Sequence, residues 1–193
     1  MPHLSRRAFI TSVGGSVAAV WFTAKATDLL ASGDFAARAS REHPAPPFAI
    51  LTADQASELD AATALIIPSD ATAGAREARV VWFIDKSLGG FARKQRPVFE
   101  KGIAELTQRA AKAQKGATSF ASLTEAQQIA ILTALEKDKK NPFFNALRGA
   151  TIMGMFANPE YGGNFNKVGW KMIGFDDQFS WKAPFGWYDA NAR

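Results

Sequence analysis

Few side chains in this 193-residue chain could support acid–base or metal chemistry. They are two pairs of carboxylates and two histidines: Asp70 with Glu77, Asp176 with Asp177, His3 and His43. Paired carboxylates can act as general acid and general base, but surface carboxylates are far more common than catalytic ones, so we interpret both pairs as surface charges. Both histidines precede the predicted globular body, and cysteine is absent. Thiolate catalysis, cysteine-ligated metals and covalent c-type haem are therefore excluded in this chain, and we assign it no catalytic, cofactor-binding or metal-binding residue.

The sequence also lacks the usual signs of a nucleotide or nucleic-acid site. No Gly-x-Gly-x-x-Gly is present, and Gly162-Gly163 is neither preceded by a predicted strand nor followed by Lys-Ser or Lys-Thr, so we interpret it as a turn. Three of the five formal positive charges come from residues 1–26, so no nucleic-acid partner is expected. The basic run at 93–96 is interpreted as the solvated start of a helix, with contact to an acidic partner or anionic lipid as alternatives.

Residues 1–26 have the composition of an export signal. Its features are a twin-arginine pattern and a small-x-small cleavage site, formed by Ser5, Arg6, Arg7 and Phe9 and by Ala24 and Ala26. The apolar run between them, at 10–22, is too short to span a bilayer core comfortably. We therefore predict a periplasmic protein exported by the twin-arginine translocase. Residues 27–47, which end in a proline-rich run, are predicted to be a linker.

Residues 48–158 are predicted to form a small all-α bundle of about five helices. Thr52 with Gln55, and Thr124 with Gln127, have the spacing of capping boxes, which mark helix starts. The expected helices start near Thr52, Gly74, Pro97, Thr124 and Asn141. No stretch alternates with a period of two residues, so little or no sheet is expected.

Residues 159–193 differ from the bundle because they are rich in glycine and aromatic residues. We predict an irregular segment that wraps the outside of the bundle, since irregular backbone cannot be buried without hydrogen-bond partners. Its rings either fill the core or face a partner protein, and partner contact is favoured for those at 179–188. The candidate interface residues are Tyr161, Gly162, Gly163, Asn164, Phe165, Trp170, Phe175, Trp181 and Trp187.

Several motifs in this part of the chain resemble one known family. The strongest are Asn158-Pro159, Tyr161-Gly162-Gly163-Asn164, Gly169-Trp170 and Ile173-Gly174-Phe175, supported by Ile67-Pro68-Ser69-Asp70 with Gly74-Ala75 and by residues 81–88. Together they are similar to the gluconate 2-dehydrogenase subunit 3 family over about residues 48–177. Ala73 departs from the pattern, because the family usually has proline before the Gly-Ala pair.

The resemblance implies a non-catalytic small subunit of an oxidoreductase complex that acts on CH–OH groups, resembling gluconate 2-dehydrogenase or glycoside 3-dehydrogenase. The implied partners are a large glucose–methanol–choline-type subunit with FAD and, in some complexes, a cytochrome subunit with haem c. It also implies export of the folded pair and peripheral membrane association through the complex. Two alternatives remain: a purely structural subunit without an export role, and a stand-alone periplasmic enzyme or ligand-binding domain.

Overall fold

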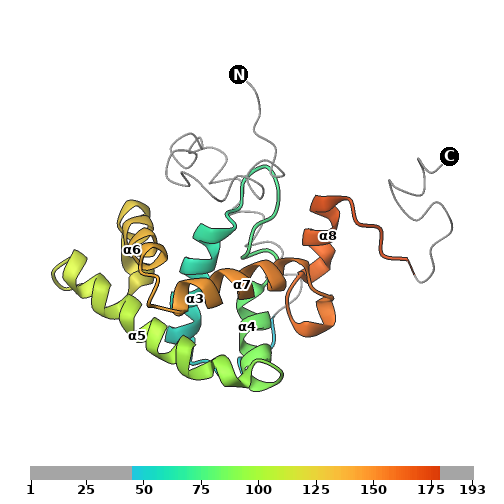
Figure 1. The fold of residues 1–193 in the computed structure, drawn as a ribbon. Helices are drawn as coiled ribbons and strands as arrows, with labels where there is room; N and C mark the ends of the chain where they lie inside the picture. Colours follow the sequence, from blue (N-terminus) through green and yellow to red (C-terminus); the bar gives the residue numbers. More distant parts are fainter. Residues whose placement is uncertain (1–44, 179–193) are drawn as a thin grey trace.

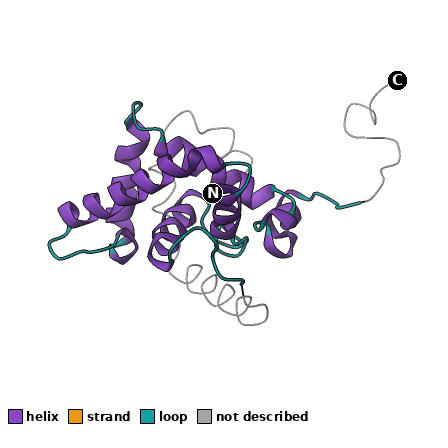
Figure 2. Cartoon of the chain, turned by 90° about the horizontal axis from the view of Figure 1, so that it is seen from below, coloured by secondary structure: helices purple, strands orange, loops and turns teal. Residues whose placement is uncertain are grey.

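The computed structural model describes residues 45–178, which form a bundle of six α-helices (Figure 1). These are α3 (Ala53–Ile66), α4 (Val80–Gly89), α5 (Arg96–Ala113), α6 (Glu125–Lys137), α7 (Phe143–Phe156) and α8 (Val168–Ile173). Short 3₁₀ turns are η3 (Arg93–Gln95), η4 (Phe120–Ser122), η5 (Pro159–Tyr161) and η6 (Phe165–Lys167). No strand occurs between residues 45 and 178 (Figure 2), so the prediction of an all-α fold is confirmed.

Some predicted features lie outside the described residues. These are the export signal at 1–26, residues 27–44 of the linker, and residues 179–193 with Trp181 and Trp187. Within 45–178, none of the helices combines the length and the apolar character that crossing a membrane requires.

Helix α7 is the centre of the bundle, because it touches each of the other five α-helices (Figure 1). Leu147, Thr151 and Met155, spaced four residues apart on one face, have no exposed surface. Phe143 continues this row by one turn, and Gly102 on α5 allows a close approach to it, since a Cβ there would lie 2.0 Å from the Phe143 ring. Full burial stabilises each large apolar side chain by roughly 1.5–3 kcal/mol, so α7 holds much of the core energy.

The local start signals of three helices are confirmed. Gln55 donates its backbone N–H to the Thr52 hydroxyl at 3.2 Å, and the Thr52 N–H donates to the Gln55 side chain at 3.0 Å, which completes the capping box of α3. The same reciprocal arrangement at Thr124 and Gln127 opens α6. Pro97 lies in the first turn of α5, where its missing N–H is not needed.

Helix α4 begins at Val80, and the expected start near Gly74 was six residues too early. The carboxylate of Glu77 accepts hydrogen bonds from the Ser69 hydroxyl at 2.6 Å and the Gly74 N–H at 2.7 Å, which closes residues 69–77 into a loop. Arg79 then has a left-handed backbone with φ of 54°, so the helix can start only after it. The segment after residue 158, predicted to be irregular, contains the short helix α8 and two 3₁₀ turns.

Glu77 is one of three buried carboxylates that hold loops by accepting backbone N–H groups. The carboxylate of Asp85 accepts three such bonds, each of 2.8 Å, from residues 49–51 just before α3. Glu58 on α3 accepts bonds from Phe120 at 3.1 Å and Ala121 at 3.0 Å, in η4. Hydrogen bonds to an ionised group are stronger than neutral ones, so each acid ties a loop firmly to the bundle.

We expect Asp85→Asn to lower the free energy of unfolding by about 1–3 kcal/mol, because an amide accepts at only one of its two ends, so at least one of the three N–H groups loses its acceptor and the charge that strengthens the other bonds is gone. Urea unfolding followed by far-UV circular dichroism measures this. The matched control is Asp138→Asn, an exposed position whose Oδ1 accepts from the Lys140 N–H and can still do so, with an expected change of about 0.5 kcal/mol or less. Equal losses in the two variants would contradict the anchoring role.

Candidate docking site

The interpretation of both carboxylate pairs as surface charges is wrong for Glu77, whereas Asp70, Asp176 and Asp177 are exposed. Glu77 is buried in the loop that it closes, whereas Asp70 is exposed and accepts hydrogen bonds from the N–H and hydroxyl of Thr72 at 2.8 and 2.9 Å. Asp177 forms an ion pair of 2.5 Å with Lys167. Between residues 45 and 178, no three His, Cys, Asp or Glu side chains are grouped so that they could hold a metal ion.

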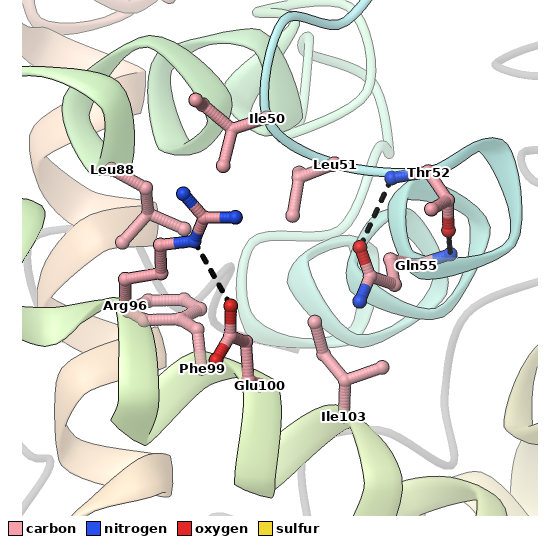
Figure 3. Close-up of a pocket in the computed structure, with 9 residues that line it drawn as sticks. All are labelled: Ile50, Leu51, Thr52, Gln55, Leu88, Arg96, Phe99, Glu100 and Ile103. Atoms are coloured by element: carbon pink, nitrogen blue, oxygen red, sulfur yellow. Dashed lines mark hydrogen bonds and ion pairs between the residues drawn. The ribbon is translucent and has the colours of Figure 1, made fainter.

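A pocket of about 190 Å³ lies between the segment before α3 and helices α4 and α5 (Figure 3). Its lining residues are Ile50, Leu51, Thr52, Gln55, Leu88, Arg96, Phe99, Glu100 and Ile103. The Arg96–Glu100 ion pair of 2.9 Å joins two half-exposed side chains of this lining. Pockets that bind cofactors are usually larger, at roughly 300–1,000 Å³. The pocket therefore does not fit FAD, and we assign it no cofactor.

The most informative site is the C-terminal end of α7, which Asn164 caps from the segment that follows. Asn164 is completely buried, and its Nδ2 donates to the carbonyl of Ala157 at 2.9 Å. Its Oδ1 accepts from the Gly169 N–H at 2.8 Å, and its own N–H donates to the carbonyl of Gly154 at 2.7 Å. The last carbonyls of a helix have no partner inside the helix, so this residue supplies partners that α7 would otherwise lack.

Two glycines let the capping segment lie directly on the backbone of α7. A Cβ at Gly163 would be 2.2 Å from the carbonyl oxygen of Gly154. A Cβ at Gly169 would be 1.9 Å from the carbonyl oxygen of Met155. Both distances are far below any van der Waals contact, and the atoms in the way belong to the backbone. Glycine is therefore required at both positions for steric reasons.

The same segment is joined to the start of α4 at a site of unusual backbone conformation. The four non-glycine residues with positive φ in 45–178 all lie here: Arg79, Asn164, Asn166 and Lys167. Phe165 donates its N–H to the carbonyl of Ala78 at 3.2 Å, and the Arg79 guanidinium lies 3.6 Å from the centre of the Phe165 ring. Burial lowers the pKa of Arg79 from its ordinary value. The cation–π contact therefore gives a partly desolvated charge a favourable neighbour.

The large apolar side chains that remain exposed are not spread evenly over the described elements. Six are exposed between residues 45 and 178: Phe91, Ile152, Met153, Tyr161, Ile173 and Phe175. Five of them come from α7, η5 and the end of α8, and Phe91 joins them because its ring packs edge-on against Tyr161, with centroids 6.3 Å apart. We call these six residues the apolar end. Helices α3, α5 and α6 expose no large apolar side chain.

The nine candidate interface residues fall into four groups. Tyr161 and Phe175 are exposed. Partly buried positions are Gly162, Phe165 and Trp170, whose indole N–H donates to the Phe156 carbonyl at 2.7 Å. Gly163 and Asn164 are buried in the cap, where they have no side-chain surface to offer a partner. Trp181 and Trp187 lie outside the described residues. The docking role of the exposed members stays a prediction.

Sequence reasoning missed four members of the apolar end: Phe91, Ile152, Met153 and Ile173. A signal for the two on α7 was available. Helix α7 has apolar residues at positions 143, 144, 147, 152, 153 and 156. They cover more of the circumference of the helix than the single apolar stripe of a helix with one buried face. Phe91 directly follows Gly89-Gly90 and precedes the basic run, where no core-facing pattern accounts for it.

We expect Gly169→Ala to destabilise the protein by about 3 kcal/mol or more, because the new methyl group would overlap the backbone of α7. The control is Gly149→Ala on α7, where nothing lies within 4 Å of the new Cβ. That change should stabilise the protein by up to about 1 kcal/mol, since alanine is the better helix former. Thermal and urea unfolding of the two variants would measure the difference. Similar stabilities would contradict the close approach described here.

Comparisons with known proteins identify the family of the chain. No curated protein and no solved structure matches the chain. The family model described as gluconate 2-dehydrogenase subunit 3 matches residues 53–177, which include all six helices and the cap of α7. The match covers well over half of the chain, and its name describes one subunit of a dehydrogenase complex. The chain therefore belongs to the gluconate 2-dehydrogenase subunit 3 family.

Proposed function

We propose that this chain is the non-catalytic small subunit of a periplasmic FAD-dependent dehydrogenase that oxidises gluconate, a sugar or a glycoside. In this proposal the FAD belongs to a large glucose–methanol–choline-type subunit, and a c-type cytochrome accepts the electrons in complexes that contain one. The small subunit stabilises the flavoprotein. Its twin-arginine signal also carries the folded pair across the membrane.

The observation that supports docking is that the exposed large apolar side chains of residues 45–178 come from few elements: the second half of α7, the segment that follows it, and Phe91, which packs against Tyr161. Phe91 is 68% exposed, Ile173 56% and Tyr161 52%, although the chain has a well-packed core for such residues. Apolar side chains gathered in this way usually mark an interaction site. Each large side chain that a partner covers adds up to roughly 1.5–3 kcal/mol, so a few of them can supply most of the affinity.

The direct test is to capture the tagged full-length chain from the cells that make it and record the visible spectrum of what binds. We expect an oxidised-flavin spectrum from a larger polypeptide, and sharp Soret and α bands after reduction if a cytochrome is present. The stand-alone alternatives predict a different result. Flavin bound to the purified chain alone, or sugar oxidation by that chain with an electron acceptor, would contradict the proposal.

The double variant Ile152→Lys with Met153→Lys should weaken capture of the flavoprotein at least tenfold, because burying two ammonium groups at an apolar contact is costly. Both positions are exposed on α7, so the fold should tolerate the change. The matched control is Ala130→Lys with Ala134→Lys, which adds the same charge to exposed positions of α6. Equal capture by both variants would exclude this part of the apolar end from the interface.

The export role makes a separate prediction. Replacing Arg6 and Arg7 by Lys should leave dehydrogenase activity in the cytoplasmic fraction, because the twin-arginine route depends on that pair. Lys25→Arg, which keeps the charge of the leader and leaves the pair intact, should not change the distribution. Unchanged periplasmic activity in the Arg6 and Arg7 variant would remove the escort role and favour a purely structural subunit.

A further inference from the structure

The exposed aromatic rings of Phe91 and Tyr161, two residues of the apolar end, pack against each other. Phe91 lies in the loop after α4 and Tyr161 in η5, and their rings meet nearly at right angles, at 79°. Behind them, Phe91 also packs against the buried ring of Phe83, with centroids 6.1 Å apart. We call Phe91 and Tyr161 the aromatic knob. It is supported by the core although more than half of each side chain faces solvent.

Two contacts between α4 and the segment around η5 fix the position of the knob. The ammonium group of Lys86 donates a hydrogen bond of 2.6 Å to the carbonyl of Glu160. Gly162 has φ of 100°, and a Cβ there would lie 3.0 Å from the carbonyl oxygen of Trp82, so η5 is seated directly on the helix. A surface that is already ordered loses little conformational entropy on binding, which is a feature of efficient recognition sites.

Exposed basic side chains lie on the two elements that flank Phe91, helix α4 and the turn η3. Lys86, Arg93 and Lys94 are all exposed, on α4 and in η3, which touch each other. Within the described residues, neither Arg93 nor Lys94 forms an ion pair, whereas the neighbouring Arg96 is paired with Glu100. Glu160 is the acidic residue adjoining the knob in sequence. The aromatic knob therefore has three exposed basic residues beside it and one acidic residue next to it in sequence.

We infer that the aromatic knob and these three cations recognise an acidic surface on the flavoprotein subunit, with the two rings entering an apolar recess bordered by carboxylates. This inference rests on the proposed function and deepens it by stating the chemistry of the partner's surface. Aromatic and arginine side chains are enriched in protein interfaces. Complementary charge around them mainly increases the rate of association and excludes wrong partners.

The observations favour a protein over a lipid surface as the partner. Segments that bind anionic lipid through charge usually gather four to eight basic residues, at about 1 kcal/mol each. Only three exposed cations beside the knob are assigned to it here, and one of them, Lys86, is already hydrogen-bonded to the Glu160 carbonyl, while Arg96 is compensated by Glu100. Rings held edge-on by the core also suit a shaped recess better than a fluid interface. Binding to an anionic membrane is kept as an outcome of the test.

The test measures the association rate constant of the recovered flavoprotein with the immobilised full-length chain. The variant is Arg93→Glu with Lys94→Glu, compared at ionic strengths of about 0.1 M and about 1 M, where the screening length falls from about 10 Å to about 3 Å. We expect association to slow about tenfold at the lower ionic strength and the difference to disappear at the higher one. The control is Lys139→Glu with Lys140→Glu, the same charge change in the exposed turn after α6, with less than a twofold effect expected.

The possible outcomes separate this inference from the proposed function. If the flavoprotein binds with the same rate and salt dependence in both variants, the inference is wrong and the proposed function stands. If wild-type chain binds vesicles that contain phosphatidylglycerol, and Arg93→Glu with Lys94→Glu abolishes only that binding, the surface is a lipid site and the inference is overturned. If no flavoprotein is captured by the wild-type chain, both are lost.

Discussion

The carbonyl groups at the C-terminal end of α7 are the constraint on which the rest of this structure depends. Helix α7 touches each of the other five α-helices between residues 45 and 178, so fraying of its end would loosen contacts throughout the bundle. The side-chain and backbone N–H groups of the buried Asn164 donate to the carbonyls of Ala157 and Gly154, and the Trp170 indole donates to that of Phe156. The glycines at 163 and 169 allow the backbone to come close enough for these bonds. The cap also brings Phe165 against the start of α4, where four left-handed residues gather. A left-handed backbone at a non-glycine residue is strained, and it persists only where the surrounding contacts hold the backbone in that conformation.

The acidic residues follow the same physical logic. Glu58, Glu77 and Asp85 are buried, and each is bound to N–H groups of a distant or irregular segment. Such bonds order loops that otherwise have little core of their own. Because the loops are held firmly, the side chains that they present at the surface have defined positions. The three segments held in this way are residues 49–51, the loop at 69–77 and η4.

Helix starts that depend on residues close together in the sequence could be predicted, whereas features that depend on contacts between distant residues could not. The starts of α3, α5 and α6 depend on residues three positions apart or on one proline, so the sequence predicts them correctly. The start of α4 depends on Glu77 reaching back to residues 69 and 74, which no helical pattern reveals. Asn164 belongs to a recognisable family motif, but nothing local distinguishes a buried cap from an interface residue. Exposure at Phe91 and Ile152 depends on which neighbours are present, a property of the whole fold.

The position of the α7 cap near the end of the described chain has a consequence for biosynthesis. A ribosome releases the polypeptide from its N-terminus at roughly 5–20 residues per second. Helices α3 to α6 can therefore emerge and begin to associate while the central helix is incomplete. Asn164 donates to the carbonyls of Gly154 and Ala157 and Trp170 donates to that of Phe156, and both residues emerge after all of these helices. Until they emerge, these carbonyls lack the partners that they have in the folded chain. A nascent chain from which Asn164 has not yet emerged therefore lacks the cap, and the bundle can close around α7 only after that residue is available.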